Sequence, residues 1–199
     1  MSSKGAFIVI EGLDGSGKST QAKLLVARLK KSHRAVYTAE PSRGKIGRFI
    51  RNSILYSNAR PPTLIETLLF AADRVDHVQN EITPALGRGK LVISDRYVYS
   101  SLAYQGSAGL DLKWIETVNE NALKPDLALF IDVNPAIVLS RLKRKKSVME
   151  NLETQRKVRE VYLRYVDKGN LTRIDGNKLK NEVAEQIFVA VTKFLENSR

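Results

Sequence analysis

The chain has 199 residues, of which 43% are hydrophobic and 27% charged, an ordinary balance for one globular domain with a substantial core. It contains no cysteine, which excludes disulfides and thiolate metal sites. Lys and Arg number 33 against 21 Asp and Glu, and the resulting net charge of +12 favours a polyanionic partner, either nucleic acid or phosphorylated nucleotides.

The apolar segments of the chain are all short. None approaches the length needed to span a bilayer, and the first of them, residues 6–10, is too short for the core of a signal peptide. The chain also shows no internal repeat and no linker long enough to separate two domains. We therefore expect a cytoplasmic protein, not associated with membranes, that forms one domain over residues 1–199.

Five short apolar runs alternate with helical patterns along the chain. Each run is continuous rather than alternating, which is typical of strands buried on both faces. The sequence thus predicts an α/β fold with a five-stranded parallel sheet flanked by helices on both faces. The expected strands are 6–10, 35–39, 91–94, 127–132 and 171–174, and the expected helices lie near 20–31, 45–57, 62–86, 97–105, 112–122, 135–146, 150–168 and 178–197.

The stretch between the first strand and the first helix is a phosphate-binding motif. It fits G-x-x-x-x-G-K-[ST] and lies in the required strand–loop–helix context, which disfavours a plain glycine-rich turn. Its backbone N–H groups and the following helix N-terminus can converge on phosphate oxygens. Lys18 would reach the β/γ-phosphates and Ser19 would bind Mg²⁺. The predicted triphosphate-binding residues are Gly12, Leu13, Asp14, Gly15, Ser16, Gly17, Lys18, Ser19 and Thr20.

The segment Glu40-Pro41-Ser42-Arg43 follows the second expected strand. Ligands of parallel α/β sheets bind at the carboxyl ends of the strands, so Pro41 and Arg43 are candidates for ligand contact. A turn with a solvated arginine is an equally good interpretation.

The helix expected at 62–86 carries two neighbouring stripes. Phe70 and Arg74 share the mainly polar stripe, where they could stack on a base and hydrogen-bond its edge. Alternatively, Phe70 widens the edge of the core and Arg74 pairs with Asp73 or Asp76. His77 is expected at the surface. The spacing of apolar residues predicts a core stripe of Leu64, Leu68, Ala71, Val75, Val78 and Ile82.

The strand expected at 91–94 runs into Asp95 and Arg96. An aspartate here can hold the hydration shell of Mg²⁺ opposite Ser19, and Arg96 would face the phosphate cleft. The alternative is an ordinary ion pair followed by a polar helix face. Helical spacing brings further polar side chains to the cleft side, namely Ser100, Ser101, Tyr104 and Gln105.

Residues 141–146 contain five cations in six positions. Such a run is usually a solvated face or a nucleic-acid patch. In a phosphoryl-transfer enzyme it could instead be a lid that carries a catalytic arginine, a contribution of roughly 3–4 kcal/mol to transition-state stabilisation.

Taken together, these segments resemble the thymidylate kinases, P-loop enzymes that pass phosphate from ATP to dTMP. The resemblance covers nearly the whole chain. It rests on Glu11–Thr20 (EGLDGSGKST), on Leu69–Arg74 (LFAADR), on Asp95-Arg96-Tyr97 with Ser100-Ser101, and on Ala103-Tyr104-Gln105.

The resemblance implies a role for each of these segments. Phe70 would stack on thymine and Arg74 would bond its edge, Arg43 and Arg96 would hold the acceptor phosphate, and Tyr104 would pack beneath the deoxyribose. The implied dTMP-binding set is Asp14, Pro41, Arg43, Phe70, Arg74, Arg96, Ser101, Tyr104 and Gln105. The implied Mg²⁺ set, partly through water, is Ser19, Asp14 and Asp95; ATP would also contact Arg141. A homodimer is implied, and a nucleic-acid partner is not.

The sequence departs from the family pattern at two places. Gly15 stands where one branch of the family has an arginine, so the catalytic arginine is expected in a lid at about 141–150, with Arg144 or Arg141 as candidates beside Lys18, Asp14 and Arg96. The segment Glu40–Arg43 also differs from the Glu-Pro-Gly-Gly of many bacterial relatives. The rival functions are a kinase for another nucleoside monophosphate, a nucleic-acid-dependent ATPase and a non-catalytic nucleotide-binding regulator.

Overall fold

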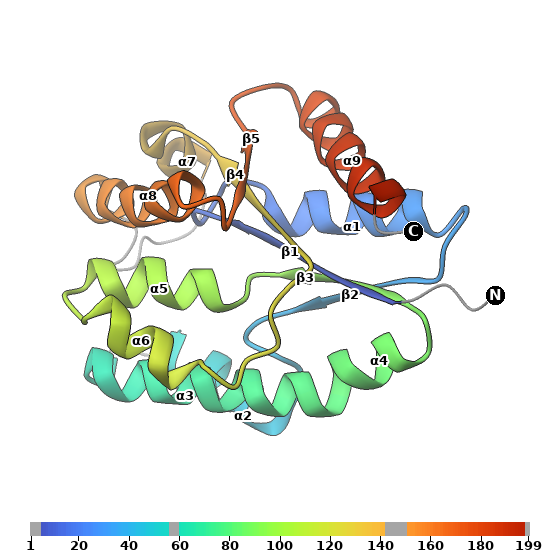
Figure 1. Ribbon diagram of the computed structural model, residues 1–199. Coiled ribbons are helices and arrows are strands. Elements are labelled where there is room, and N and C mark those ends of the chain that lie inside the picture. Colours follow the sequence, from blue (N-terminus) through green and yellow to red (C-terminus); the bar gives the residue numbers. More distant parts are fainter. Residues whose placement is uncertain (1–4, 56–59, 142–150, 198–199) are drawn as a thin grey trace.

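The computed structural model describes residues 5–55, 60–141 and 151–197. Its strands form one parallel sheet in the order β2-β3-β1-β4-β5, which confirms the predicted five-stranded α/β architecture (Figure 1). The strands are β1 (Ala6–Gly12), β2 (Ala35–Ala39), β3 (Leu91–Asp95), β4 (Leu127–Asp132) and β5 (Thr172–Asp175).

Helices cover both faces of the sheet. Figure 1 shows α1 and α9 on one side and α3, α4 and α5 on the other, while α8 packs against α5 and β4. Two π-helical turns extend neighbouring helices: η1 (Arg51–Leu55) follows α2, and η2 (Val78–Ile82) joins α3 to α4. The helices are α1 (Lys18–Leu29), α2 (Lys45–Ile50), α3 (Thr63–His77), α4 (Thr83–Gly87), α5 (Val98–Ser107), α6 (Leu112–Val118), α7 (Pro135–Arg141), α8 (Leu152–Asp167) and α9 (Lys180–Asn197).

Strand β1 is the centre of the core. All seven of its residues are buried, because β3 and β4 flank it and helices cover both its faces. Phe7 meets Tyr97 edge to face at a ring-centroid distance of 4.9 Å, and Phe130 stacks on Tyr162 of α8 at 4.7 Å. Burying each such side chain contributes about 1.5–3 kcal/mol, so the apolar run that predicted this strand also anchors the sheet.

The register of the strands sets which residues meet at the carboxyl edge of the sheet. Asp95 at the end of β3 lies opposite Ile10 on one side and Ala39 on the other. The residues that follow these positions, Glu11, Glu40 and Arg96, are therefore neighbours in space although they are far apart in the sequence. This edge is where parallel α/β proteins bind ligands.

Helix α3 turns a different face to the sheet than the sequence predicts. Leu64, Leu68 and Val75 of the predicted core stripe are 48%, 47% and 40% exposed, whereas Ala71 and, in η2, Ile82 are buried. The polar side chains of α3 lie inside instead: Glu66, Thr67, Asp73, Arg74 and His77 are all buried. The predicted surface position of His77 is thus wrong, because the interior beneath α3 is itself polar.

The remaining helix boundaries differ only in length. The helix expected at 112–122 ends at Val118, where Asn119 is the C-cap and its side-chain amide donates to the Ile115 carbonyl at 2.8 Å. Helix α7 is described to Arg141, and the rest of the expected helix, with most of the lid, lies outside the described residues. Within the part of the chain that the structure describes, no helix is long and apolar enough to cross a membrane.

Candidate active site

The predicted phosphate-binding loop connects the end of β1 to the start of α1. Gly17 precedes α1 with φ of 95°, a left-handed conformation that glycine adopts without strain. A Cβ on Gly12 would lie 2.8 Å from the Ile131 carbonyl, so only glycine fits against β4 there. The loop therefore has the backbone that the motif requires, and the N-terminus of α1 points at the same place.

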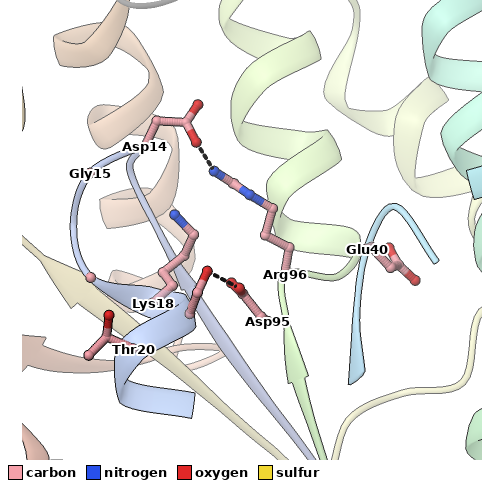
Figure 2. Close-up of a pocket in the computed structure, with 9 residues that line it drawn as sticks. Asp14, Gly15, Lys18, Thr20, Glu40, Asp95 and Arg96 are labelled. Carbon is pink, nitrogen blue, oxygen red and sulfur yellow. Dashed lines mark hydrogen bonds and ion pairs between the residues drawn. The ribbon is translucent and has the colours of Figure 1, made fainter. Parts of the chain in front are cut away.

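A polar cavity of about 390 Å³ opens between this loop and the ends of β2 and β3 (Figure 2). Eight of the predicted site residues line it, together with Glu40, whose role the sequence left unassigned. The lining residues are Asp14, Gly15, Gly17, Lys18, Ser19, Thr20, Glu40, Asp95 and Arg96. Two predicted groups, the phosphate loop and the Asp95-Arg96 pair, thus face one space.

Lys18 lies in the interior of the loop with only 6% of its surface exposed. Its ammonium group donates to the Leu13 carbonyl at 2.7 Å. Burial, assisted by the charge of Arg96, lowers the pKa of Lys18 to about 8, and nearby carboxylates oppose the shift. Lys18 is consequently still a cation at pH 7, placed to neutralise phosphate charge.

Ser19 and Asp95 meet across the cavity, the Ser19 hydroxyl donating to Asp95 Oδ2 (Figure 2). The Tyr37 hydroxyl donates to the same oxygen at 3.2 Å, and burial together with Asp95 raises the pKa of Tyr37 to about 12. The other oxygen, Asp95 Oδ1, is buried without a hydrogen-bond partner among the described residues. An oxygen in this state suits a cation or a cation-bound water.

Asp14 and Arg96 form an ion pair across the mouth of the cavity, with Arg96 Nη2 2.6 Å from Asp14 Oδ1 (Figure 2). Tyr104 completes the cluster: its hydroxyl accepts from the Asp14 backbone N–H at 3.0 Å and donates to Asp14 Oδ2 at 3.2 Å. Burial favours the neutral form of Asp14, but the charges of Arg96 and Lys18 outweigh it and lower the pKa to about 2. Asp14 is therefore ionised at every physiological pH.

Arg74 is almost completely buried and is held by partners that the sequence did not indicate. Its guanidinium donates twice to Glu40 Oε2, at 2.7 and 3.0 Å, and also to Ser101 Oγ at 3.2 Å and to Asn119 Oδ1. Neither of the expected partners, Asp73 and Asp76, forms this pair. Arg74 thus lies behind Glu40 rather than on the lining of the cavity.

His77 belongs to the same buried cluster. Its Nδ1 lies 3.3 Å from Glu40 Oε1, and its Nε2 lies 2.6 Å from the Thr38 hydroxyl. Glu40 therefore has contacts to both Arg74 and His77, which explains why α3 turns its polar face inward.

The loop after β2 is fixed by Asp73. This carboxylate accepts from the Ser42 backbone N–H at 2.7 Å and from the Ser42 hydroxyl at 2.6 Å, while Arg51 donates to the Pro41 and Ser42 carbonyls. Arg43 is exposed and Pro41 is partly buried. The structure consequently places Arg43 beside the cleft edge of the sheet, on a rigid loop.

The other predicted residues lie around this centre. Phe70 is partly buried, and Gln105 is buried with its Nε2 donating to Glu66 at 3.0 Å. Arg141 is exposed at the end of α7, and Arg144 lies outside the described residues. These four positions, like Arg74, are not part of the cavity lining.

Sequence reasoning missed the carboxylates that support the site. Glu40 stood in the sequence at a strand end, directly before Pro41, and that position was a usable signal. Glu11 was visible only as part of the motif, and nothing in the sequence linked it to Ser100 or to Tyr162 of α8. Asn119, at the end of α6, carried no signal at all.

A parallel sheet of this order, with a Gly12–Thr20 phosphate loop at the end of its central strand, defines a P-loop nucleotide-binding α/β protein. A family model described as Thymidylate kinase matches residues 10–187 of this chain. The chain belongs to the thymidylate kinase family.

Relatives from several archaea agree with this assignment. A "Probable thymidylate kinase" of Pyrococcus horikoshii is 46% identical over 172 residues, which cover 82% of this chain and 84% of the relative. Proteins with the same name from Pyrobaculum aerophilum and Pyrococcus abyssi are each 42% identical and cover 92% and 96% of this chain, and 94% and 97% of their own lengths. The similarity is thus spread over the whole domain.

Proposed function

We propose that this chain transfers the γ-phosphate of ATP to dTMP, giving ADP and dTDP. The observation that carries the proposal is the convergence of Lys18, Asp95 and Arg96 on one cavity in a member of the thymidylate kinase family. In this arrangement the phosphate loop binds the donor, and Arg96 on the far side binds the acceptor phosphate. The two phosphates would be brought into line between them.

The donor half of the site is built from the loop Gly12–Thr20. Its backbone N–H groups and Lys18 would hold the β- and γ-phosphates of ATP, and Arg141 would contact the nucleotide from the end of α7. We propose that Ser19 and Asp95 hold Mg²⁺, with Asp14 acting partly through water. The unpartnered Asp95 Oδ1 beside Ser19 fits this role.

No group of three or more His, Asp or Glu side chains able to hold a metal exists in ranges 5–55, 60–141 and 151–197. That absence agrees with Mg²⁺ being held jointly with nucleotide phosphates rather than by a protein cage. When bound, Mg²⁺ neutralises phosphate charge in the transition state.

The acceptor half would use the side chains around Arg96. Arg43 and Arg96 would bind the phosphate of dTMP, and Tyr104 would pack beneath the sugar next to Asp14. Around the base we propose stacking by Phe70 and edge contacts from Arg74, Ser101 and Gln105, with Pro41 beside them. Glu40 supports this proposal, because its two hydrogen bonds fix the guanidinium of Arg74 in one orientation.

Chemistry in this site needs no protein base, because the acceptor phosphate is already a nucleophile. The chain's own contribution is to position both nucleotides, to exclude water and to supply cations toward the transferred group. Lys18 and Arg96, with Asp14 orienting Arg96, would do this from the described residues. A lid arginine, Arg144 or Arg141, would complete the set; positions 142–150 lie outside the described residues.

A coupled assay of ADP release over a panel of nucleoside monophosphates tests the proposal. We expect dTMP to be the preferred acceptor, and Lys18→Met to abolish turnover. A preferred purine acceptor would overturn the thymidylate assignment. ATP turnover that requires DNA or RNA, or ATP binding without transfer to any acceptor, would instead support the rival functions.

We also propose that the chain forms a homodimer through α2 and α3. Support comes from the apolar stripe that α3 turns away from the sheet: Leu64, Ile65, Leu68 and Val75, with Phe49 of α2, are each 40–51% exposed. Patches of this kind on a folded domain typically mark an interaction surface, and a second copy can present the same stripe about a two-fold axis. We place this enzyme in the cytoplasm, where both proposed substrates are found.

A further inference from the structure

Glu11, at the end of β1, is a completely buried carboxylate outside the cavity lining. Four donors surround it. Its Oε1 accepts from the backbone N–H groups of Tyr97 and Ser100, at 2.8 and 3.3 Å, and its Oε2 accepts from the hydroxyls of Ser100 and Tyr162, at 2.7 and 3.1 Å. A buried charge so fully bonded is costly to keep unless it has a purpose beyond packing.

The backbone next to Glu11 is strained at Arg96. This residue has φ of 75°, and it is the one non-glycine residue with positive φ within the described ranges. Three contacts hold it there: the Arg96 N–H donates to the Ile10 carbonyl at 3.0 Å, the Arg96 carbonyl accepts from Ser94 Oγ at 2.8 Å, and the next N–H along the chain donates to Glu11. Glu11 therefore fixes the turn from which the arginine side chain projects.

A second chain of contacts runs through the side chains. Ser100 has one hydroxyl hydrogen, and the Glu11 carboxylate takes it, so the lone pairs of Ser100 Oγ face outward. Arg96 Nη1 donates to that oxygen at 2.8 Å, while Arg96 Nη2 is held by Asp14. Glu11 and Asp14 thus grip the two ends of one guanidinium, Glu11 indirectly and Asp14 directly.

We propose that Glu11 is a positioning residue for the acceptor phosphate, acting through Ser100 and through the backbone of Arg96. The proposal rests on the proposed function, in which Arg96 binds the phosphate of dTMP. Tyr162 ties the same carboxylate to α8, so the orientation of Arg96 also depends on how α8 packs against α5.

The sign of the effect separates positioning from simple charge balance. As a mere counter-charge, Glu11 would weaken the positive potential around Arg96, and its neutralisation would tighten binding of a dianionic phosphate. As a positioning residue it orients the donors, and its neutralisation would weaken that binding. The two interpretations predict opposite changes in one dissociation constant.

The test measures binding of dTMP and of thymidine, which lacks the phosphate, to the full chain by calorimetry. Glu11→Gln is expected to raise the Kd for dTMP about tenfold, the worth of one charge-assisted hydrogen bond, and to leave the Kd for thymidine unchanged. Ser100→Ala keeps the carboxylate but removes the link, and should show the same selective loss. Glu185→Gln, at an exposed glutamate paired with Arg28, is the matched control and should change neither constant.

Three results would overturn the inference: tighter dTMP binding by Glu11→Gln, equal weakening of dTMP and thymidine, or no change in either. If Glu11→Gln does not fold, as a thermal melt would show, Ser100→Ala decides the question by the same criteria. A wild-type chain that binds dTMP no better than thymidine would instead contradict the proposed function itself.

Discussion

Replacing Arg74 by methionine is expected to destabilise the fold strongly, because Arg74 and Glu40 form an ion pair with side-chain exposures of only 2% and 3%. The substitution removes both hydrogen bonds to Glu40 Oε2 and leaves that carboxylate with His77 Nδ1 at 3.3 Å. Breaking a buried pair from one side costs about 3–5 kcal/mol, which for a domain of this size lowers Tm by roughly 6–20 °C.

A double-mutant cycle gives this reasoning its sharpest form. Glu40→Gln removes the charge that Arg74→Met leaves alone, so the double variant should recover about 2 kcal/mol of the free energy of unfolding relative to Arg74→Met. Urea denaturation of the wild type, both single variants and the double variant measures that coupling. Arg28→Met, in an exposed ion pair with Glu185, is the control and should cost no more than about 1 kcal/mol.

The reasoning is refuted if Arg74→Met costs as little as Arg28→Met, or if the effects of Arg74→Met and Glu40→Gln simply add. Either result would mean that the carboxylate of Glu40 is not left uncompensated in the interior.

Three further predictions concern the metal site, a titration and the surface. Asp95→Asn should raise the Mg²⁺ concentration needed for half-maximal turnover and lower kcat at least about tenfold, whereas Asp111→Asn, at the exposed N-cap of α6, should do neither; a metal titration of each variant decides. Burial raises the pKa of Glu11 from 4.5 to about 7, so this group's contribution to stability is full below pH 4.5 and is lost as pH rises through 7. Denaturation between pH 4.5 and 8.5 should therefore show Glu11→Gln gaining about 3 kcal/mol on the wild type, and a pH-independent difference would contradict the assignment. Leu68→Glu should halve the mass seen by sedimentation equilibrium, while Leu179→Glu, at a leucine 76% exposed before α9, should not; a wild-type monomer would contradict the dimer.

Much of the fold could be predicted from the chain alone. The five strands were predicted within one or two residues of their ends, because parallel strands buried on both faces must be continuous apolar runs, and such runs are easy to see. The phosphate loop was equally visible, since its glycines and Lys18 are required by local backbone geometry and not by distant contacts.

The inward face of α3 could not be predicted in this way. Helical periodicity separates an apolar stripe from a polar one, and it assumes that the apolar stripe faces the core. Here the interior beside α3 is occupied by Glu40 and Thr38, so Arg74 and His77 face inward and Leu68 faces out. A helix between a polar interior and an exposed apolar surface reverses the usual rule.

By itself, then, the sequence determined the parallel α/β class, the position of the phosphate loop and the chemical types that gather near it. Only the tertiary structure decided which groups support them: Glu40 behind Arg74, and Glu11 behind Arg96 through Ser100. The physical reason is the register of β2, β3 and β1, which places their carboxyl ends side by side. Contacts across that edge join residues up to 89 positions apart, and no local pattern in the chain encodes them.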